Sequence, residues 1–392
     1  MLRSVEGSDI NVQGTNDDAQ ISKLSCSKAG YFRDEFIQYF VKRASRRSPL
    51  INRGYYSRHA ALRQLLNSFL ATAARAAAGD RQPPQLLALG AGFDTTWFQL
   101  ARDAGGRAPY RCLEVDFKEV TQRKAAIIAK EPQLHSLLRQ PPDNAPQADG
   151  GQQQQQQSEQ PAPSSDSGPG RPDGPRPEAG SAGAGAATHG VEIDPGKGQI
   201  LSPMYCLVPV DLRDIDALDR AVQLAGWDRS APTYVLSECV LVYMEPQHST
   251  AVARWAAGAF PNAAMVIYEQ IRPDDAFGRQ MVSNLEMRGC PLKGLPATPT
   301  LEAHRARLTG AGWSWADARD MDELYRTFVD VADRARAERL ELFDELEEWH
   351  MIQEHYCIAV GRNDAAGWLA GFGFGERPAE AARPMARLPL VD

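Results

Sequence analysis

The fold of this chain is decided by the stretch Leu86–Asp94, which reads LLALGAGFD. Its first four residues are apolar, which is typical of a buried strand in a parallel sheet. The Gly-Ala-Gly turn that follows lacks two Cβ atoms, so it permits positive φ angles and a close approach of a ligand to the backbone. A helix is expected to begin at Thr95. Strand, turn and helix together predict a ligand cradle at the carboxyl edge of an open α/β sheet, although tight packing alone also produces such turns.

A second apolar run, Tyr110–Phe117, ends in an acidic residue, Asp116. Asp116 follows Gly90 by about 26 residues, near the spacing at which an acid binds ribose hydroxyls in nucleotide-binding units. The pyrophosphate pattern G-x-G-x-x-G is incomplete, because Thr95 occupies the place of the third glycine. These features favour an adenosine ligand without phosphates over a dinucleotide, and S-adenosylmethionine is the leading candidate.

Composition restricts the classes of function. The chain has 392 residues, enough for one large domain or two smaller ones, and its formal net charge of −7 argues against a general nucleic-acid binder. None of its cysteines forms a C-x-x-C pair, and His350 and His355 lack the spacing of a helical metal pair, so no metal is expected. Without a signal peptide or a long apolar run, the sequence predicts a soluble cytoplasmic protein with no membrane partner.

The rest of the chain continues the alternation of strands and helices. Further strands are expected at 205–210, 233–242, 264–270 and 356–360, and helices at 118–130, 215–225 and 246–260. Two mainly helical segments, 17–80 and 277–345, are expected to add a cap. The first contains the aromatic-rich stretch Tyr31–Val41, whose rings are expected to pack in a core, with direct ligand contact as the alternative.

Three segments are expected to lie outside the folded core. Residues 1–16 are polar and predicted to be a disordered tail, and residues 363–392 are predicted to be flexible. Residues 140–198 contain the glutamine run Gln152–Gln157 and few aliphatic residues, so they cannot bury enough apolar surface to offset the cost of ordering. We interpret them as a disordered insertion within a single domain, 17–362, because the strand–helix alternation resumes directly afterwards.

Charged residues near the predicted edge of the sheet are candidates for ligand binding. Glu238 lies within the apolar run Thr233–Val242, where a carboxylate is costly unless it is paired or faces a ligand. Arg53 and Arg58 precede an amphipathic helical stretch shortly before the glycine turn. Exposed arginines are usually just solvated, so these two need further support.

With these pieces assembled, the sequence closely resembles the leucine carboxyl methyltransferase family. The ordered segments that carry the resemblance are DDAQISK, INRGYYSR, LLALGAGFDTT, LEVDF, DLRD, ECVLVYMEP, YEQIRPDDAFG, MRGCPLKG and DELEEWH. The resemblance implies a Rossmann-like α/β methyltransferase fold and S-adenosylmethionine as cofactor. It also implies methylation of the C-terminal leucine carboxylate of protein phosphatase 2A type catalytic subunits, an activity expected of a monomer.

The resemblance also implies roles for particular residues. They are Lys23, Arg58 and Glu238 at the methionine end of the cofactor, Gly90 at the glycine turn, Asp116 at the ribose, Asp211 and Leu212 at the adenine, and Tyr243 near the transferred methyl. Arg58 and Tyr243 are the candidate catalytic residues. The long insertion is the one departure from the family pattern, and it leaves the flanking motifs intact.

Elementary chemistry agrees with these assignments. The methionine portion of the cofactor carries a carboxylate and an ammonium, so it requires a cation and an anion side by side, and the donors of an arginine match a planar carboxylate. A peptide C-terminus has a pKa of about 3.5 and is already ionised at pH 7. Direct in-line methyl transfer therefore needs no general base, and catalysis is expected to come from positioning and desolvation.

Two other functions remain open at this point. One is a related carboxyl methyltransferase that acts on a modified tRNA base in the wybutosine pathway; such proteins usually carry a β-propeller extension, and no such repeat is found here. The other is a non-catalytic adaptor that binds adenosine compounds, which would be expected to have lost cofactor residues.

Overall fold

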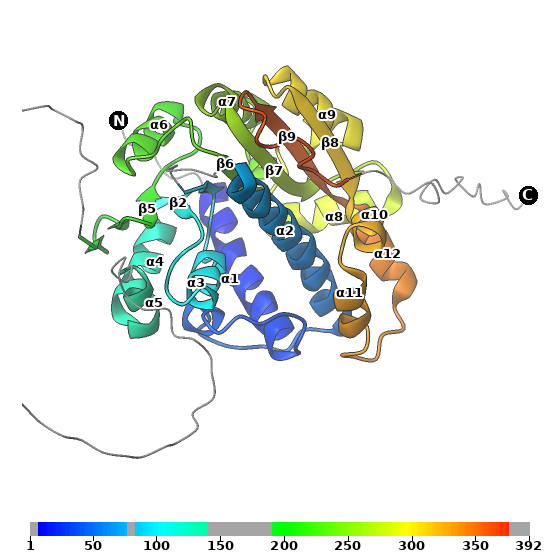
Figure 1. Cartoon of the computed structure of the whole chain (residues 1–392). Helices are drawn as coiled ribbons and strands as arrows, with labels where there is room; N and C mark the ends of the chain where they lie inside the picture. Colours follow the sequence, from blue (N-terminus) through cyan, green and yellow to red (C-terminus); the bar gives the residue numbers. More distant parts are fainter. Residues whose placement is uncertain (1–6, 77–82, 140–189, 376–392) are drawn as a thin grey trace, which may run out of the picture. The chain divides into compact units, whose positions relative to one another are not determined.

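A mostly parallel sheet forms the centre of the computed structural model, which describes residues 7–76, 83–139 and 190–375 (Figure 1). Within these residues the sheet has nine strands in the order β3-β4-β5-β2-β1-β6-β7-β9-β8. Their bounds are β1 Gln85–Leu89, β2 Arg111–Asp116, β3 Glu192–Asp194, β4 Gln199–Leu201, β5 Tyr205–Pro209, β6 Thr233–Glu238, β7 Asn262–Gln270, β8 Trp315–Asp320 and β9 Tyr356–Asp364. In the sheet, the adjacent strands β5, β2, β1, β6 and β7 are parallel to one another, whereas β4 and β9 run antiparallel to their neighbours.

Strand β1, the apolar run that precedes the glycine turn, lies in the middle of the sheet. All five of its residues are buried, and it pairs with β2 on one side and β6 on the other. Strands β2 and β5 are neighbours, so the sequence on both sides of the long insertion contributes to one sheet. The predicted Rossmann-like α/β sheet is therefore confirmed.

Helices cover both faces of the sheet (Figure 1). Side chains alternate along β1, so Leu86 and Ala88 join one apolar cluster while Leu87 and Leu89 join the other. The first cluster includes side chains of α2 Pro49–Ala76, α3 Thr96–Asp103, α4 Lys118–Lys130, α5 Pro132–Leu137 and α10 Met321–Thr327. The second includes side chains of α6 Ile215–Leu224, α7 Pro246–Ala259 and α9 Leu301–Gly310.

A third apolar cluster joins the helices that we call the cap. It contains Tyr31, Tyr56, Tyr325 and Trp349 and links α1 Gly7–Lys28, α2 and α10 with α11 Val331–Ala337 and α12 Leu346–Glu354. The segment 277–345 is cap only in part, since α9 packs on the opposite face and β8 lies in the sheet. The aromatic-rich stretch after α1 forms a short 3₁₀ helix, Ile37–Phe40, and most of its rings are buried in the core, as predicted.

Helix α1 begins at Gly7, so the prediction of a disordered tail is wrong for residues 7–16. This part of α1 has little apolar periodicity because it is held by polar contacts, among them an ion pair between Asp9 and Arg213. The hydrophobic pattern of the sequence could not reveal such contacts. Residues 1–6 lie outside the described part.

The structure also differs from the sequence prediction at the edges of the insertion and of the C-terminal tail. Strands β3 and β4 lie inside or directly after the predicted insertion 140–198, and Ile200 fills a core position. In the predicted flexible tail, β9 continues to Asp364, and Phe372 packs edge-on against Phe69 with ring centroids 5.7 Å apart. The hydrophobic pattern of the sequence does not identify such residues as core residues, because they are isolated among glycines. The remainder of both predictions, residues 140–189 and 376–392, lies outside the described residues.

Strand β8 was not predicted, because its sequence WADARD is polar and lies between helical segments. It forms an edge of the sheet by antiparallel pairing with β9, where only Ala318 and Arg319 are buried. None of the described helices combines the length and apolar character needed to cross a membrane.

Candidate functional site

A cavity of about 720 Å³ lies along the carboxyl ends of the parallel strands. Its size falls within the range of roughly 300–1,000 Å³ that is typical of small-molecule sites. The eight residues predicted from the sequence all line it: Lys23, Arg58, Gly90, Asp116, Asp211, Leu212, Glu238 and Tyr243. The structure therefore brings the whole predicted set together, from segments that span more than half of the chain.

The glycine turn after β1 forms one wall of this cavity and has no room for side chains. Gly90 has a φ of +61°, and a Cβ atom there would stand 2.6 Å from a methyl carbon of Val240. Gly92 has a φ of +53°, and a Cβ atom there would meet the side-chain oxygen of Asn16 on α1 at 2.5 Å. Both positions therefore require glycine.

Asp116, the last residue of β2, is held rigidly beside this turn. One carboxylate oxygen accepts the backbone N–H of Gly92 at 2.7 Å, and the other accepts that of Phe117 at 2.7 Å. Burial raises the pKa of Asp116, and these two backbone donors oppose the rise, which leaves the pKa at about 6. Each oxygen keeps further acceptor capacity, so the carboxylate can bind a pair of hydroxyl groups.

A buried ion pair between α4 and β2 stabilises the backbone that follows the glycine turn. Lys124 of α4 is fully buried, pairs with Glu114 of β2, and donates to the carbonyl oxygen of Asp94 at 2.7 Å. Glu114 also accepts the hydroxyl of Tyr205 at 2.8 Å. Burial raises the pKa of Glu114 to about 7, against the attraction of Lys124. The pair thus fixes the backbone that leads from the turn into α3.

Charged side chains cluster at the end of β6. Arg58 of α2 donates through Nε to Glu238, and the Lys23 ammonium lies 3.7 Å from Glu238 and 3.8 Å from Asp94. Burial alone would raise the pKa of Glu238, but Arg58 and Lys23 outweigh it and lower the pKa to about 2. The cluster therefore holds two cations and two carboxylates, a set that can exchange partners with a zwitterionic ligand.

The end of the cavity at β5 combines a polar and an apolar wall. Arg213 binds Asp211 at 2.8 Å and also Asp9 of α1 at 2.8 Å, which ties the first turn of α1 to the sheet. Leu212, between them, is buried and presents apolar surface to the cavity. A flat aromatic ligand with polar edges fits this combination.

The chain bends sharply after β6 and leads to Tyr243. Cys239 adopts a φ of +56°, a strained conformation that is found preferentially at functional sites. The short 3₁₀ helix Leu241–Tyr243 follows and carries Tyr243 into the cavity wall. Burial raises the pKa of Tyr243, so its hydroxyl stays protonated and can donate a hydrogen bond. Arg53, by contrast, donates to the carbonyl oxygen of Glu338 in the cap and does not line this cavity.

Some residues that line the cavity were not predicted from the sequence. Asn16 and Gln20 of α1 face it, and Asn16 accepts the backbone N–H of Phe93 at 3.1 Å. Gln270 and Tyr356 face it from the end of β7 and the start of β9. The polar residue at the end of the apolar strand β7 was a usable signal, the same one that identified Asp116.

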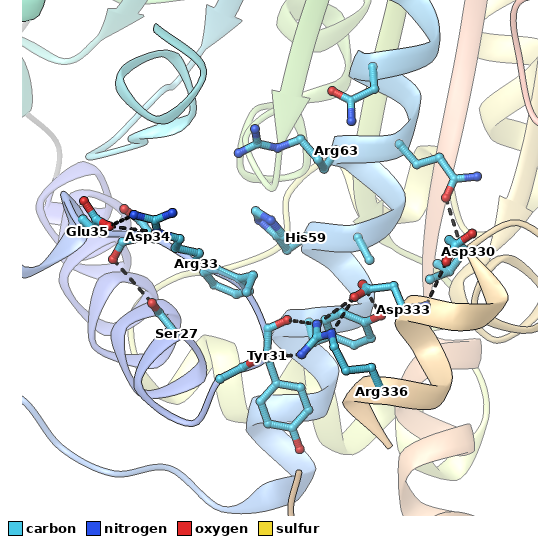
Figure 2. A pocket seen from close by; sticks show the side chains of 17 residues that line it. Ser27, Tyr31, Arg33, Asp34, Glu35, His59, Arg63, Asp330, Asp333 and Arg336 are labelled. Atoms are coloured by element: carbon cyan, nitrogen blue, oxygen red, sulfur yellow. Dashed lines mark hydrogen bonds and ion pairs between the residues drawn. The ribbon is translucent and has the colours of Figure 1, made fainter. Parts of the chain in front are cut away.

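A second cavity of about 730 Å³ lies between the loop after α1, the outer face of α2 and the start of α11 (Figure 2). Several of its charged side chains pair with one another: Arg33 with Glu35, and Arg336 with Asp333 at 2.8 Å. His59 stacks on Phe32, and burial together with Arg63 lowers its pKa to about 3, so it is neutral at physiological pH. None of the predicted site residues lines this cavity, so the carboxyl edge of the sheet is the better candidate.

The doubly wound sheet, its glycine turn and the charged cluster at its carboxyl edge agree with the fold and the site expected of an S-adenosylmethionine-dependent methyltransferase. Residues 12–257 match the family model of leucine carboxyl methyltransferase. The chain is 44% identical to a leucine carboxyl methyltransferase 1 homolog from Arabidopsis thaliana, over 95% of this chain and 96% of that protein. The chain belongs to the leucine carboxyl methyltransferase family.

Two further relatives show how widely the sequence is shared. Leucine carboxyl methyltransferase 1 from Rattus norvegicus is 31% identical over 91% of this chain and 90% of that protein. The human tRNA wybutosine-synthesizing protein 4 is 37% identical over 90% of this chain but only 44% of that protein.

Proposed function

We propose that this protein transfers the methyl group of S-adenosylmethionine to the C-terminal leucine α-carboxylate of protein phosphatase 2A type catalytic subunits. The product is a methyl ester that regulates assembly of the phosphatase holoenzyme. Membership of the family and the Arabidopsis relative, matched over nearly its whole length, support this choice. The observation that carries the catalytic part of the proposal is the Lys23–Arg58–Glu238 cluster beside the glycine turn.

The cavity suits the cofactor along its length. We assign the ribose hydroxyls to Asp116, the adenine to Asp211 and Leu212, and the backbone approach to Gly90. Lys23 and Arg58 are assigned to the carboxylate of the methionine portion, and Glu238 to its ammonium. Gly90 lines the cavity, and a Cβ atom there would collide with Val240, so the turn presents backbone rather than a side chain to the cofactor.

The residues of the site act by position and charge. Bound S-adenosylmethionine supplies an electrophilic methyl group. The acceptor carboxylate is ionised at neutral pH, so no residue needs to remove a proton. We propose that Arg58 and the protonated hydroxyl of Tyr243 orient this carboxylate, and that the buried walls of the cavity exclude water.

Recognition of the phosphatase is proposed to involve two surfaces. Leu285 and Pro291 line the cavity, and Leu285 packs with Tyr243 against one apolar cluster, so these two side chains offer an apolar floor for a leucine side chain. Such a floor discriminates by only about 1–3 kcal/mol, so a second contact with the folded partner is needed. Leu342, which is 94% exposed, and the exposed Leu346 and Met351 place apolar side chains on the surface of the cap for that contact.

A methyl-transfer assay with labelled cofactor tests the proposal. The phosphatase catalytic subunit, the same subunit without its terminal leucine, and tRNA carrying the wybutosine precursor are offered in parallel. Labelling of the intact subunit alone is expected. Labelling of the tRNA instead would favour the second candidate, which the 37% identity to the human wybutosine protein keeps in view. Binding of cofactor without any transfer would indicate an adaptor. We further propose that the protein acts as a monomer in the cytoplasm.

A further inference from the structure

Gln270 carries a buried polar atom for which the described residues provide no partner. Its side chain is 3% exposed and lines the cavity at the end of β7, yet its Oε1 atom accepts no hydrogen bond. A buried acceptor without a donor is costly, so such atoms in a binding cavity usually mark the place of a ligand group.

Gln270 lies opposite Tyr356 in the antiparallel register of β7 and β9. Burial raises the pKa of Tyr356 to about 12, so its hydroxyl stays protonated at neutral pH. The amide oxygen of Gln270 has no donor among the described residues and is the atom that remains for a ligand group.

The ring of Tyr356 also connects Gln270 to the charged cluster. It stacks on Tyr268 with ring centroids 5.4 Å apart and an interplanar angle of 18°. The Arg58 guanidinium lies over the other ring, 4.5 Å from the centroid of Tyr268. Gln270 thus stands at a fixed place relative to Arg58, on rigid strands.

The order of the strands shows which part of the reaction Gln270 faces. Along the carboxyl edge, β5, β2, β1 and β6 carry the residues assigned to adenine, ribose, backbone contact and methionine. Neighbouring strands are about 4.8 Å apart, so the end of β7 lies one step beyond the methionine portion. With the methionine portion assigned to β6, the end of β7 is the adjoining part of the cavity that is left for the acceptor group.

We propose that the amide oxygen of Gln270 accepts the backbone N–H of the residue whose carboxylate is methylated. This inference rests on the proposed function and deepens it. At the end of a peptide chain, the N–H and the carboxylate are attached to the same α-carbon. Arg58 can therefore bind the carboxylate while Gln270 accepts the N–H. A side-chain carboxylate of Asp or Glu has no N–H in that relation. A neutral amide also accepts the N–H without repelling the carboxylate, which a Glu at this position would do.

The test removes the N–H from the substrate rather than from the enzyme. A phosphatase catalytic subunit is prepared by peptide ligation with a tail whose last residue is leucine or its hydroxy-acid analogue, which replaces the terminal amide N–H by an ester oxygen. In a third tail, the ester replaces the preceding peptide bond, so that the N–H of the last residue is kept. The kcat/KM of methyl transfer is measured for each tail with the wild type, Gln270→Met, and Gln280→Met, an exposed control on α8 (Ala276–Met287) that does not line the cavity.

The wild type and Gln280→Met are expected to lose about tenfold in kcat/KM on the terminal ester, and little on the earlier one. Gln270→Met is expected to be about tenfold slower on the normal tail and insensitive to the terminal ester, with unchanged affinity for S-adenosylhomocysteine. An equal loss on the terminal ester in Gln270→Met and the wild type would overturn the assignment, and so would no loss in the wild type. Failure of the wild type to methylate the normal tail would instead refute the proposed function.

Discussion

Replacement of Asp116 by alanine gives the sharpest test of the cofactor site. The substitution removes the carboxylate assigned to the ribose and leaves the backbone N–H groups of Gly92 and Phe117 without their acceptor. Hydrogen bonds to a charged group contribute about 1.5–3 kcal/mol, so the affinity for S-adenosylhomocysteine should fall by about 10- to 150-fold. Isothermal titration calorimetry measures this directly, after circular dichroism has shown that the variant is folded. Unchanged affinity in a folded variant would refute the assignment.

The pKa of Asp116 adds a signature that a merely structural role would not produce. With a pKa of about 6 in the free protein, only about a tenth of the molecules carry an ionised Asp116 at pH 5. Hydroxyl donors favour the ionised form, so the wild type should bind S-adenosylhomocysteine about tenfold more weakly at pH 5 than at pH 7. Asp116→Asn should bind weakly at both values, without this step. An equal pH step in Asp116→Asn would show that another group is responsible.

The same shift has a defined sign for stability. Because the folded state holds the pKa of Asp116 above its ordinary value of about 3.9, the folded protein binds more protons than the unfolded chain between about pH 4 and 6. The contribution of Asp116 to the free energy of unfolding therefore falls as pH rises through this window. Denaturant titrations of wild type and Asp116→Asn, both without ligand, should converge toward pH 4.

Three further predictions concern other parts of the chain. Glu238→Gln leaves Arg58 without its carboxylate partner and should lower the free energy of unfolding by about 3 kcal/mol in denaturant titrations, whereas a loss below 1 kcal/mol would mean that the pair is effectively solvated. Replacement of residues 145–188, which leaves β3 in place, by a short flexible linker should leave activity and Tm nearly unchanged, because loop closure depends weakly on length, and loss of the fold would show that this segment packs. At saturating cofactor, turnover should be flat from about pH 6 to 8; a steep rise of the chemical step through pH 7 would reveal a general base.

The sequence was most informative where a polar residue interrupts or ends an apolar run. Asp116 and Glu238 were identified in this way, because a charge at the end of a buried strand must face a partner or a ligand. The structure places both in one cavity, as the parallel arrangement of β2 and β6 on either side of β1 requires. Gln270 follows the same rule at the end of β7, and the rule could have found it.

The sequence was least informative where contacts are polar or made by isolated residues. Residues 7–16 form the first turns of α1, which are secured by Asp9 and Asn16, and neither contact has a periodic signature. Strand β8 is defined by its pairing with β9, which depends on a neighbour that lies far along the chain. Phe372 packs on Phe69 from a glycine-rich segment whose composition indicates a frayed end. In each case tertiary contacts decide the local structure.

The measurement that tests the central claim most directly compares two phosphatase preparations. The intact catalytic subunit and the same subunit without its terminal leucine are incubated with this protein and labelled S-adenosylmethionine, and mass spectrometry locates the label. We expect a methyl ester at the terminal leucine of the intact subunit, formed far faster than on the isolated tail peptide, and no label on the truncated or amidated subunit. Equal labelling of the intact and truncated subunits would contradict this account.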